Sequence, residues 1–208
     1  MGPVGTTARV RAAYAFGVLA GRSARQVSPS ALQGAGIALL QMIVDDNRRT
    51  RIAGSRVAGY VFAAPIDGGP APVRPNGLAG ALVQQLNQPN DDEQEAAMEA
   101  LGLLREIAVL PTLTDVYQRA RSRNDGDAAA AALEALTRIG DPSTRPLVAA
   151  LAGDSWGSRR DEAGLVVAYA RARFLQDGSV DRLRDATDDR RLGARARAYL
   201  AELGQPVP

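Results

Sequence analysis

Histidine, cysteine and lysine are missing from this chain of 208 residues, so all 25 basic residues are arginine. Without cysteine there can be no disulfide or thiolate nucleophile, and zinc sites built from cysteine and histidine are excluded. A Ser-His-Asp triad and a Schiff-base lysine are excluded as well. Any catalysis would have to use Asp, Glu, Ser, Thr, Tyr or Arg. We predict no catalytic residue, metal or cofactor, and a GC-rich coding bias explains the missing residue types most simply.

Aromatic residues and long apolar runs are also scarce. Aromatics make up 4% of the chain, whereas 46% of its residues are hydrophobic, mostly alanine and leucine. This composition favours closely packed helices over a β-sandwich. No apolar run approaches the roughly 18 residues that span a bilayer, so no membrane span is predicted. A faint leader-like pattern at 9–20 leaves an exported form with its leader removed open, but a cytoplasmic location is favoured.

Apolar residues recur at steps of three and four residues, which is the period of an amphipathic helix. Leu133, Leu136 and Ile139 show this spacing, and so do Leu192, Ala196 and Tyr199. The pattern predicts eleven helices, near 7–20, 30–45, 48–63, 76–88, 91–107, 110–122, 125–139, 143–152, 158–175, 178–187 and 190–203.

The helices belong to a repeated unit. Gly17, Gly59 and Gly102 occupy equivalent places in similar apolar segments, 42 and 43 residues apart, and Thr137 takes the same place 35 residues later. A unit of about 30 to 45 residues is the size of a helix–turn–helix repeat. Eleven helices then make about five hairpins, and the unpaired first helix resembles the second member of a hairpin, either because the chain was cut from something longer or because it caps the end.

Turn residues punctuate the predicted helices. Ser28-Pro29 and Asp141-Pro142 each place an N-cap oxygen before a proline at the first helical position. Gly140, Gly153 and Gly204 follow apolar periods, where a left-handed cap needs no Cβ. The Pro/Gly-rich segment 65–75 is long for a helix–helix connection. It is interpreted as a loop wrapped over a helix edge or, alternatively, as a partner-contacting extended segment.

The segment Ala135–Pro142 resembles HEAT repeats, and in particular the short bacterial HEAT-like repeats first described in phycobilisome lyases. That family's second helix ends in Ala-Leu-x-x-Ile/Leu-Gly-Asp, and the next helix opens with proline and carries Pro-x-Leu-x-x-Leu. Arg145–Leu151 fits this opening, Asp177–Leu183 is a degenerate copy, and Val10–Ala13 is similar to the family's Val-Arg-x-x-Ala helix. The resemblance implies an all-α, right-handed α-solenoid of about five HEAT-like hairpins in one continuous domain, 1–208.

In such solenoids the second helices line the concave face, so their polar residues are the natural contact set. Net charge is +6 over residues 1–60, −5 over 61–140 and +1 over 141–208. This segregation favours a groove that binds a protein or peptide of mixed charge. Helix phase predicts seven contact residues on this face: Arg51, Arg56, Glu95, Glu99, Arg138, Arg171 and Arg195.

Two other functions are weighed against this scaffold. HEAT-like families include DNA glycosylases, and Trp156 with Asp161, flanking Arg159 and Arg160, is a sparse candidate cluster for that activity. The acidic middle of the chain disfavours nucleic acid, and Trp156 is better explained as packing over a hairpin turn. A carboxylate-pair glycosidase fails because the pairs at 45–46, 91–92 and 188–189 are sequence neighbours, which diverge around a helix.

Overall fold

The computed structural model describes residues 3–23, 27–66, 69–88, 90–151 and 155–207. Within these ranges the chain forms helices and no strands, which confirms the all-α fold class. The α-helices are α1 (Pro3–Ser23), α2 (Pro29–Ile43), α3 (Arg48–Val61), α4 (Leu78–Gln85), α5 (Asp91–Leu104), α6 (Leu110–Ser122), α7 (Gly126–Ile139), α8 (Arg145–Ala150), α9 (Glu162–Phe174), α10 (Ser179–Asp185) and α11 (Gly193–Glu202). Each corresponds to one predicted range.

The predicted caps form as the side chains require. The Ser28 hydroxyl accepts a hydrogen bond from the amide of Ala31, with Pro29 at the start of α2. The Asp141 carboxylate accepts from the amide of Ser143, where Pro142 opens a short 3₁₀ turn before α8. Gly140 and Gly204 both have positive φ, at 75° and 67°. Gly153 lies outside the described residues.

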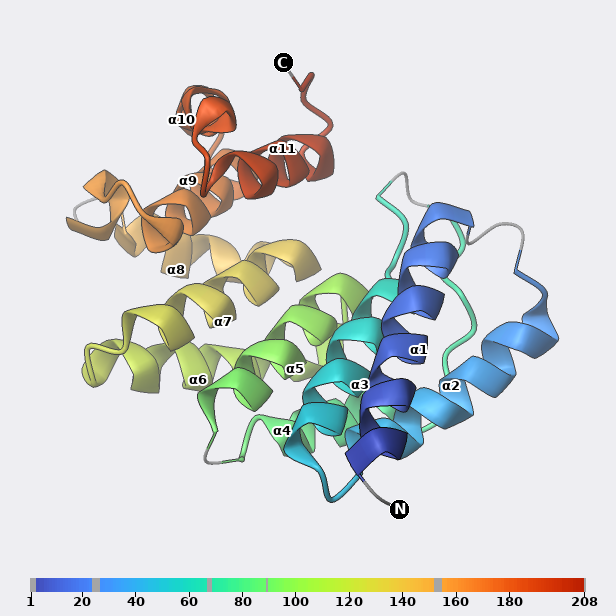
Figure 1. Cartoon of the computed structure of the whole chain (residues 1–208). Helices are drawn as coiled ribbons and strands as arrows, with labels where there is room; N and C mark the ends of the chain where they lie inside the picture. The colour runs from blue at the N-terminus through green and yellow to red at the C-terminus, as the bar shows by residue number, and fades with distance from the viewer. Residues whose placement is uncertain (1–2, 24–26, 67–68, 89, 152–154, 208) are drawn as a thin grey trace. The chain divides into compact units, whose positions relative to one another are not determined.

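The chain folds as two compact units, Met1–Val109 and Leu110–Pro208, called unit 1 and unit 2 below. Each unit consists of helical hairpins that stack in chain order, as Figure 1 shows by colour. Stacked hairpins bury the apolar stripe that a single hairpin would leave in water. The α-solenoid arrangement is thereby confirmed, and the prediction of one continuous domain stays a prediction.

Unit 1 contains two hairpins, α2–α3 and α4–α5, with α1 packed on α3. The helices form two rows: α2 and α4 contact each other as first helices, while α3 contacts both α1 and α5 in the row of second helices. Helix α1 therefore takes the place of a second helix, as its sequence predicts.

The recurring glycines allow the second helices to approach closely. A Cβ added at Gly17 of α1 would lie 3.1 Å from Cγ1 of Val57 on α3. A Cβ added at Gly59 of α3 would lie 2.8 Å from the Cα of Ala100 on α5, closer than real Cβ atoms come to backbone. The 42-residue spacing of these glycines thus marks the same helix–helix contact in consecutive repeats.

Unit 2 contains the hairpins α6–α7, α8–α9 and α10–α11. The first helices α8 and α10 are short, whereas α6 has 13 residues. Its second helices α7, α9 and α11 supply most of the core. Tyr169 of α9 and Tyr199 of α11 are fully buried and stack with ring centroids 4.2 Å apart and planes inclined by 5°. The two leucines of α7, Leu133 and Leu136, are fully buried as well.

The loop between α3 and α4 is fastened along unit 1. The amide of Ala64 donates to the carbonyl of Leu103 at 2.9 Å, and the Arg74 guanidinium donates to the carbonyl of Leu104. Pro75 packs on α2, where a Cβ added at Gly36 would lie 3.1 Å from the proline ring. These contacts hold the described part of the segment against the end of α5 and the middle of α2.

Candidate functional site

The second helices of unit 1 present a mixed apolar and charged surface to solvent. On α3, Arg49, Ile52, Arg56 and Tyr60 recur at steps of three and four residues, opposite the buried stripe of the helix. Tyr60 is 50% exposed. Tyrosine and arginine are the residues that most often carry binding energy in protein interfaces, which makes this stripe a candidate for partner contact.

Helices α1 and α5 extend this stripe on either side. On α1, Tyr14 and Val18 are 41% and 55% exposed and flank the contact of Gly17 with Val57. On α5, Glu95 and Glu99 are partly exposed, one turn apart. We call this set the Tyr60 surface; it comprises Tyr14, Val18, Ile52, Arg56, Tyr60, Glu95 and Glu99.

Glu99 holds the two central side chains of the Tyr60 surface in place. The Tyr60 hydroxyl donates to Oε1 of Glu99 at 2.7 Å. The Nε atom of Arg56 lies 3.6 Å from Oε2 of the same carboxylate. Because all three side chains are anchored before a partner arrives, less rotamer entropy is lost on binding.

Arg51 lies on the same helix, but its guanidinium forms hydrogen bonds within the molecule. Its Nε donates to Oε1 of the buried Glu93 at 2.6 Å, and its Nη1 donates to the carbonyls of Asp45 and Asp46, each at 2.8 Å. Arg51 therefore joins α5 and the α2–α3 turn to α3.

The second helices of unit 2 meet in a buried charged network. Arg138 of α7 is ion-paired with Glu134 of the same helix at 2.8 Å and with Glu202 of α11 at 3.2 Å, and only 11% of its side chain is exposed. The other oxygen of Glu202 accepts a hydrogen bond from the Tyr169 hydroxyl at 2.6 Å. Arg195 of α11 pairs with Glu134 at 3.6 Å and with Glu162 at 3.0 Å.

Burial and charge in this network shift the pKa of its members. Burial by itself would lower the pKa of Arg138, but the charges of Glu134 and Glu202 outweigh it and raise that pKa. The pKa of Tyr169 is raised, first by burial and then by Glu202. Burial followed by the charge of Glu134 likewise raises the pKa of Tyr199. Both phenols therefore stay protonated over the physiological pH range.

The seven predicted contact residues thus lie in different parts of the two units. Arg56, Glu95 and Glu99 lie together on the Tyr60 surface, whereas Arg138 and Arg195 meet in the network of unit 2. Arg171, at the end of α9, pairs with Asp177 at 2.7 Å. The role of all seven in partner binding stays a prediction.

Sequence reasoning missed the exposed apolar members of the Tyr60 surface. Tyr60 lies four residues after Arg56, and Tyr14 lies three before Gly17, so both share the helix phase of residues that the repeat pattern identifies. Helix phase alone could have found them, but charge segregation directs attention to ionisable residues only.

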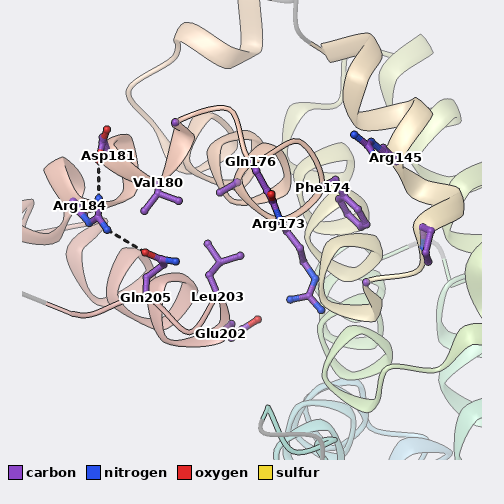
Figure 2. A pocket seen from close by; sticks show the side chains of 14 residues that line it. Arg145, Arg173, Phe174, Gln176, Val180, Asp181, Arg184, Glu202, Leu203 and Gln205 are labelled. Atoms are coloured by element: carbon purple, nitrogen blue, oxygen red, sulfur yellow. Dashed lines mark hydrogen bonds and ion pairs between the residues drawn. The ribbon is translucent and has the colours of Figure 1, made fainter.

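A pocket of about 810 Å³ opens in unit 2 where α7, α9 and α11 end. Arg145 of α8, Arg173 of α9 and Arg184 of α10 are among its lining residues, together with Glu202. Figure 2 shows the Arg173 side chain extending between Phe174 on one side and Glu202 and Leu203 on the other. We call this cavity the Arg173 pocket.

The candidate glycosylase cluster has structural partners. The guanidinium carbon of Arg121 lies 4.2 Å from the centre of the Trp156 ring, and a Cβ added at Gly126 would lie 3.9 Å from that ring. Trp156 therefore packs over the α6–α7 turn, as predicted. Asp161 caps α9 by accepting from the amide of Gly164 at 3.0 Å, and it pairs with Arg159.

Comparison with known families agrees with this architecture. The family model described as HEAT repeats matches residues 79–168, from α4 into α9. Residues 79–168 therefore resemble HEAT repeats. A search of curated proteins finds no match to it. HEAT repeats commonly serve as protein-interaction scaffolds, and the matched HEAT repeats include α5, which supplies Glu95 and Glu99 to the Tyr60 surface. The phycobilisome-lyase subtype stays a prediction.

None of the described helices has both the length and the apolar character needed to cross a bilayer. Among the residues that the structure describes, no group of three or more acidic side chains is placed to hold a metal ion.

Proposed function

We propose that this protein is a non-catalytic scaffold that binds a protein or peptide on the second-helix surface of its HEAT repeats, the surface that this architecture turns to the concave side. The observation that carries the proposal is the Tyr60 surface. There, exposed tyrosines and an arginine stand beside glutamates on three adjacent helices. This combination matches the composition of interaction hot spots.

The charge balance of the surface favours a protein over a nucleic acid. Arg56 is compensated by Glu99, and Glu95 adds a further negative charge next to them. A phosphate backbone would approach these carboxylates at a cost in repulsion. A polypeptide with apolar side chains and charges of both signs meets no such cost.

Site-specific photocrosslinking tests the proposal directly. Benzoylphenylalanine is placed at Tyr60 or Tyr14 in the full chain expressed in the source organism, and crosslinked products are identified by mass spectrometry. We expect both positions to capture the same polypeptide, because they lie on one surface. The crosslink should weaken when Arg56→Glu is added, since the reversed charge repels Glu99 and alters the surface.

The matched control is benzoylphenylalanine at Ile37, which is 53% exposed on the first helix α2. Equal capture at position 37 would contradict a docking site on the second helices. Crosslinking of positions 14 and 60 to nucleic acid instead of protein would replace the proposal with the nucleic-acid alternative.

A further inference from the structure

The Arg173 pocket in unit 2 combines uncompensated positive charge with an apolar wall. Two of its ionised groups are already neutralised by neighbours: Asp181 pairs with Arg184 at 2.8 Å, and Glu202 pairs with Arg138 at 3.2 Å while accepting from Tyr169. Among the described residues, no carboxylate lies within ion-pair distance of Arg145 or Arg173. The pocket therefore holds a net positive charge.

The guanidinium of Arg173 packs over Gly140. A Cβ added at Gly140 would lie 2.5 Å from Nη2 of Arg173, so the guanidinium lies directly over this glycine. Gly140 ends α7 with φ of 75°, where a side chain would be strained as well. The absence of a side chain at position 140 thus leaves room for the cation at the wall of the cavity.

Apolar side chains lie next to this cation. Phe174, Val180 and Leu203 line the pocket with the arginines, and each is only partly exposed. Figure 2 shows Val180 and Leu203 facing the space beside Arg173. The volume of about 810 Å³ lies within the range of cavities that hold ligands.

We infer that the Arg173 pocket binds a peptide carboxylate that stands next to an apolar side chain. A planar guanidinium binds the two oxygens of a carboxylate side by side. A single negative charge suits the site better than the double charge of a phosphate, because Glu202 and the carbonyl ends of α7, α9 and α11 are close by. The site is separate from the Tyr60 surface, so either can fail without the other.

The test uses the full chain and a library of heptapeptides displayed with free C-termini. Selection on wild-type protein should enrich sequences with a carboxylate beside an apolar residue. Enriched peptides are then synthesised with a C-terminal acid or amide, and with internal Asp or Glu replaced by Asn or Gln. These forms distinguish a terminal from a side-chain carboxylate, and the one that removes the recognised group should bind at least about tenfold more weakly.

Variants of the protein locate the binding. Arg173→Gln should weaken the peptide at least about tenfold in fluorescence anisotropy. Arg145→Gln, at an exposed position that the fold does not need, should weaken it severalfold. Arg190→Gln removes the same charge from an exposed position outside the pocket and should change nothing.

Thermal unfolding shows whether each variant is folded. If Arg173→Gln does not fold, the affinity of the peptide for Arg145→Gln tests the inference. Three results would overturn the inference: no sequence is enriched, the peptides bind Arg145→Gln and Arg173→Gln as tightly as wild type, or a phosphoserine peptide binds more tightly than its carboxylate counterpart.

Discussion

Arg138 shows how a single residue ties the second helices of unit 2 together. Its guanidinium is shared between Glu134 on α7 and Glu202 on α11, and Glu202 is also bound by Tyr169 of α9. Taking such charges out of water is costly, so the network is stable only while every member keeps its partner. Loss of one partner leaves a buried charge uncompensated.

We therefore predict that Arg138→Met lowers the free energy of unfolding by about 3–5 kcal/mol, measured by urea denaturation. Adding Glu134→Gln and Glu202→Gln to the same chain should recover most of the loss. Glu202, which loses its ion pair with Arg138, is then neutral, and Glu134 no longer depends on Arg195 alone. Arg119→Met, at an exposed position on α6, serves as the control and should change stability by less than about 0.5 kcal/mol. A triple variant no more stable than Arg138→Met would show that the arginine acts through packing.

At the scale of single residues, the sequence predicts local features better than distant partners. The cap residues Ser28, Asp141 and Gly140 take their expected roles because a cap depends on neighbours within four residues. The pairing of Arg138 with Glu202 spans 64 residues and depends on how α7, α9 and α11 converge around the tyrosine pair. Helix phase places Arg138 on the second-helix face, but it contains no information about which side chain lies opposite.

At the scale of elements, every predicted helix forms, and its boundaries differ from the prediction by a few residues. Helix α9 begins at Glu162, after the residue 158 that the apolar pattern indicates, because the Asp161 side chain caps the amide of Gly164. The 42-residue glycine spacing also has its explanation here, since Gly17 and Gly59 mark equivalent contacts between second helices. Their partners, Val57 and Ala100, could not be named from a single sequence.

The α3–α5 contact allows a test with two glycines in helices. Gly59→Ala places a methyl group against Ala100, so we expect overpacking to lower the free energy of unfolding by about 1–3 kcal/mol. Gly80→Ala on α4 has open space around the new Cβ. It should raise stability by about 0.5–1 kcal/mol through helix propensity. Thermal and urea denaturation measure both, and stabilisation by Gly59→Ala would contradict the close approach of these helices.

At the scale of the whole molecule, oppositely charged segments of the sequence supply ion pairs between second helices of the same unit. In unit 1, Arg51 and Arg56 from the basic first segment pair with Glu93 and Glu99 from the acidic middle. In unit 2, the partners of Glu134 include Arg195 from the last segment. Many of the charges that make the ends basic and the centre acidic therefore form ion pairs within a unit. The exposed apolar residues of the Tyr60 surface distinguish the candidate site more clearly than charge does.

Four aspartates of unit 2 have a lowered pKa, which makes the stability of this unit depend on pH. In unit 2, hydrogen bonds from Ser143 lower the pKa of Asp141. Hydrogen bonds from the backbone of Leu192 and Arg191 lower the pKa of Asp189. At Asp161 and Asp177 burial is the largest single influence and raises the pKa, but hydrogen bonds and a neighbouring arginine together outweigh it and lower the pKa of both. A carboxyl with a lower pKa in the folded state stabilises the fold above its unfolded pKa of about 4. That stabilisation is lost as pH falls through the lower, folded value.

We expect unit 2 to lose stability progressively below about pH 4. The fluorescence of Trp156, the only tryptophan of the chain, reports this loss because its ring packs on Arg121 of α6. In the variant Asp161→Asn/Asp189→Asn, the amide oxygens still accept the backbone hydrogen bonds but do not titrate. Its urea midpoint should therefore fall less between pH 5 and pH 2.5 than that of wild type, and an equal fall in both proteins would mean that other groups govern acid unfolding.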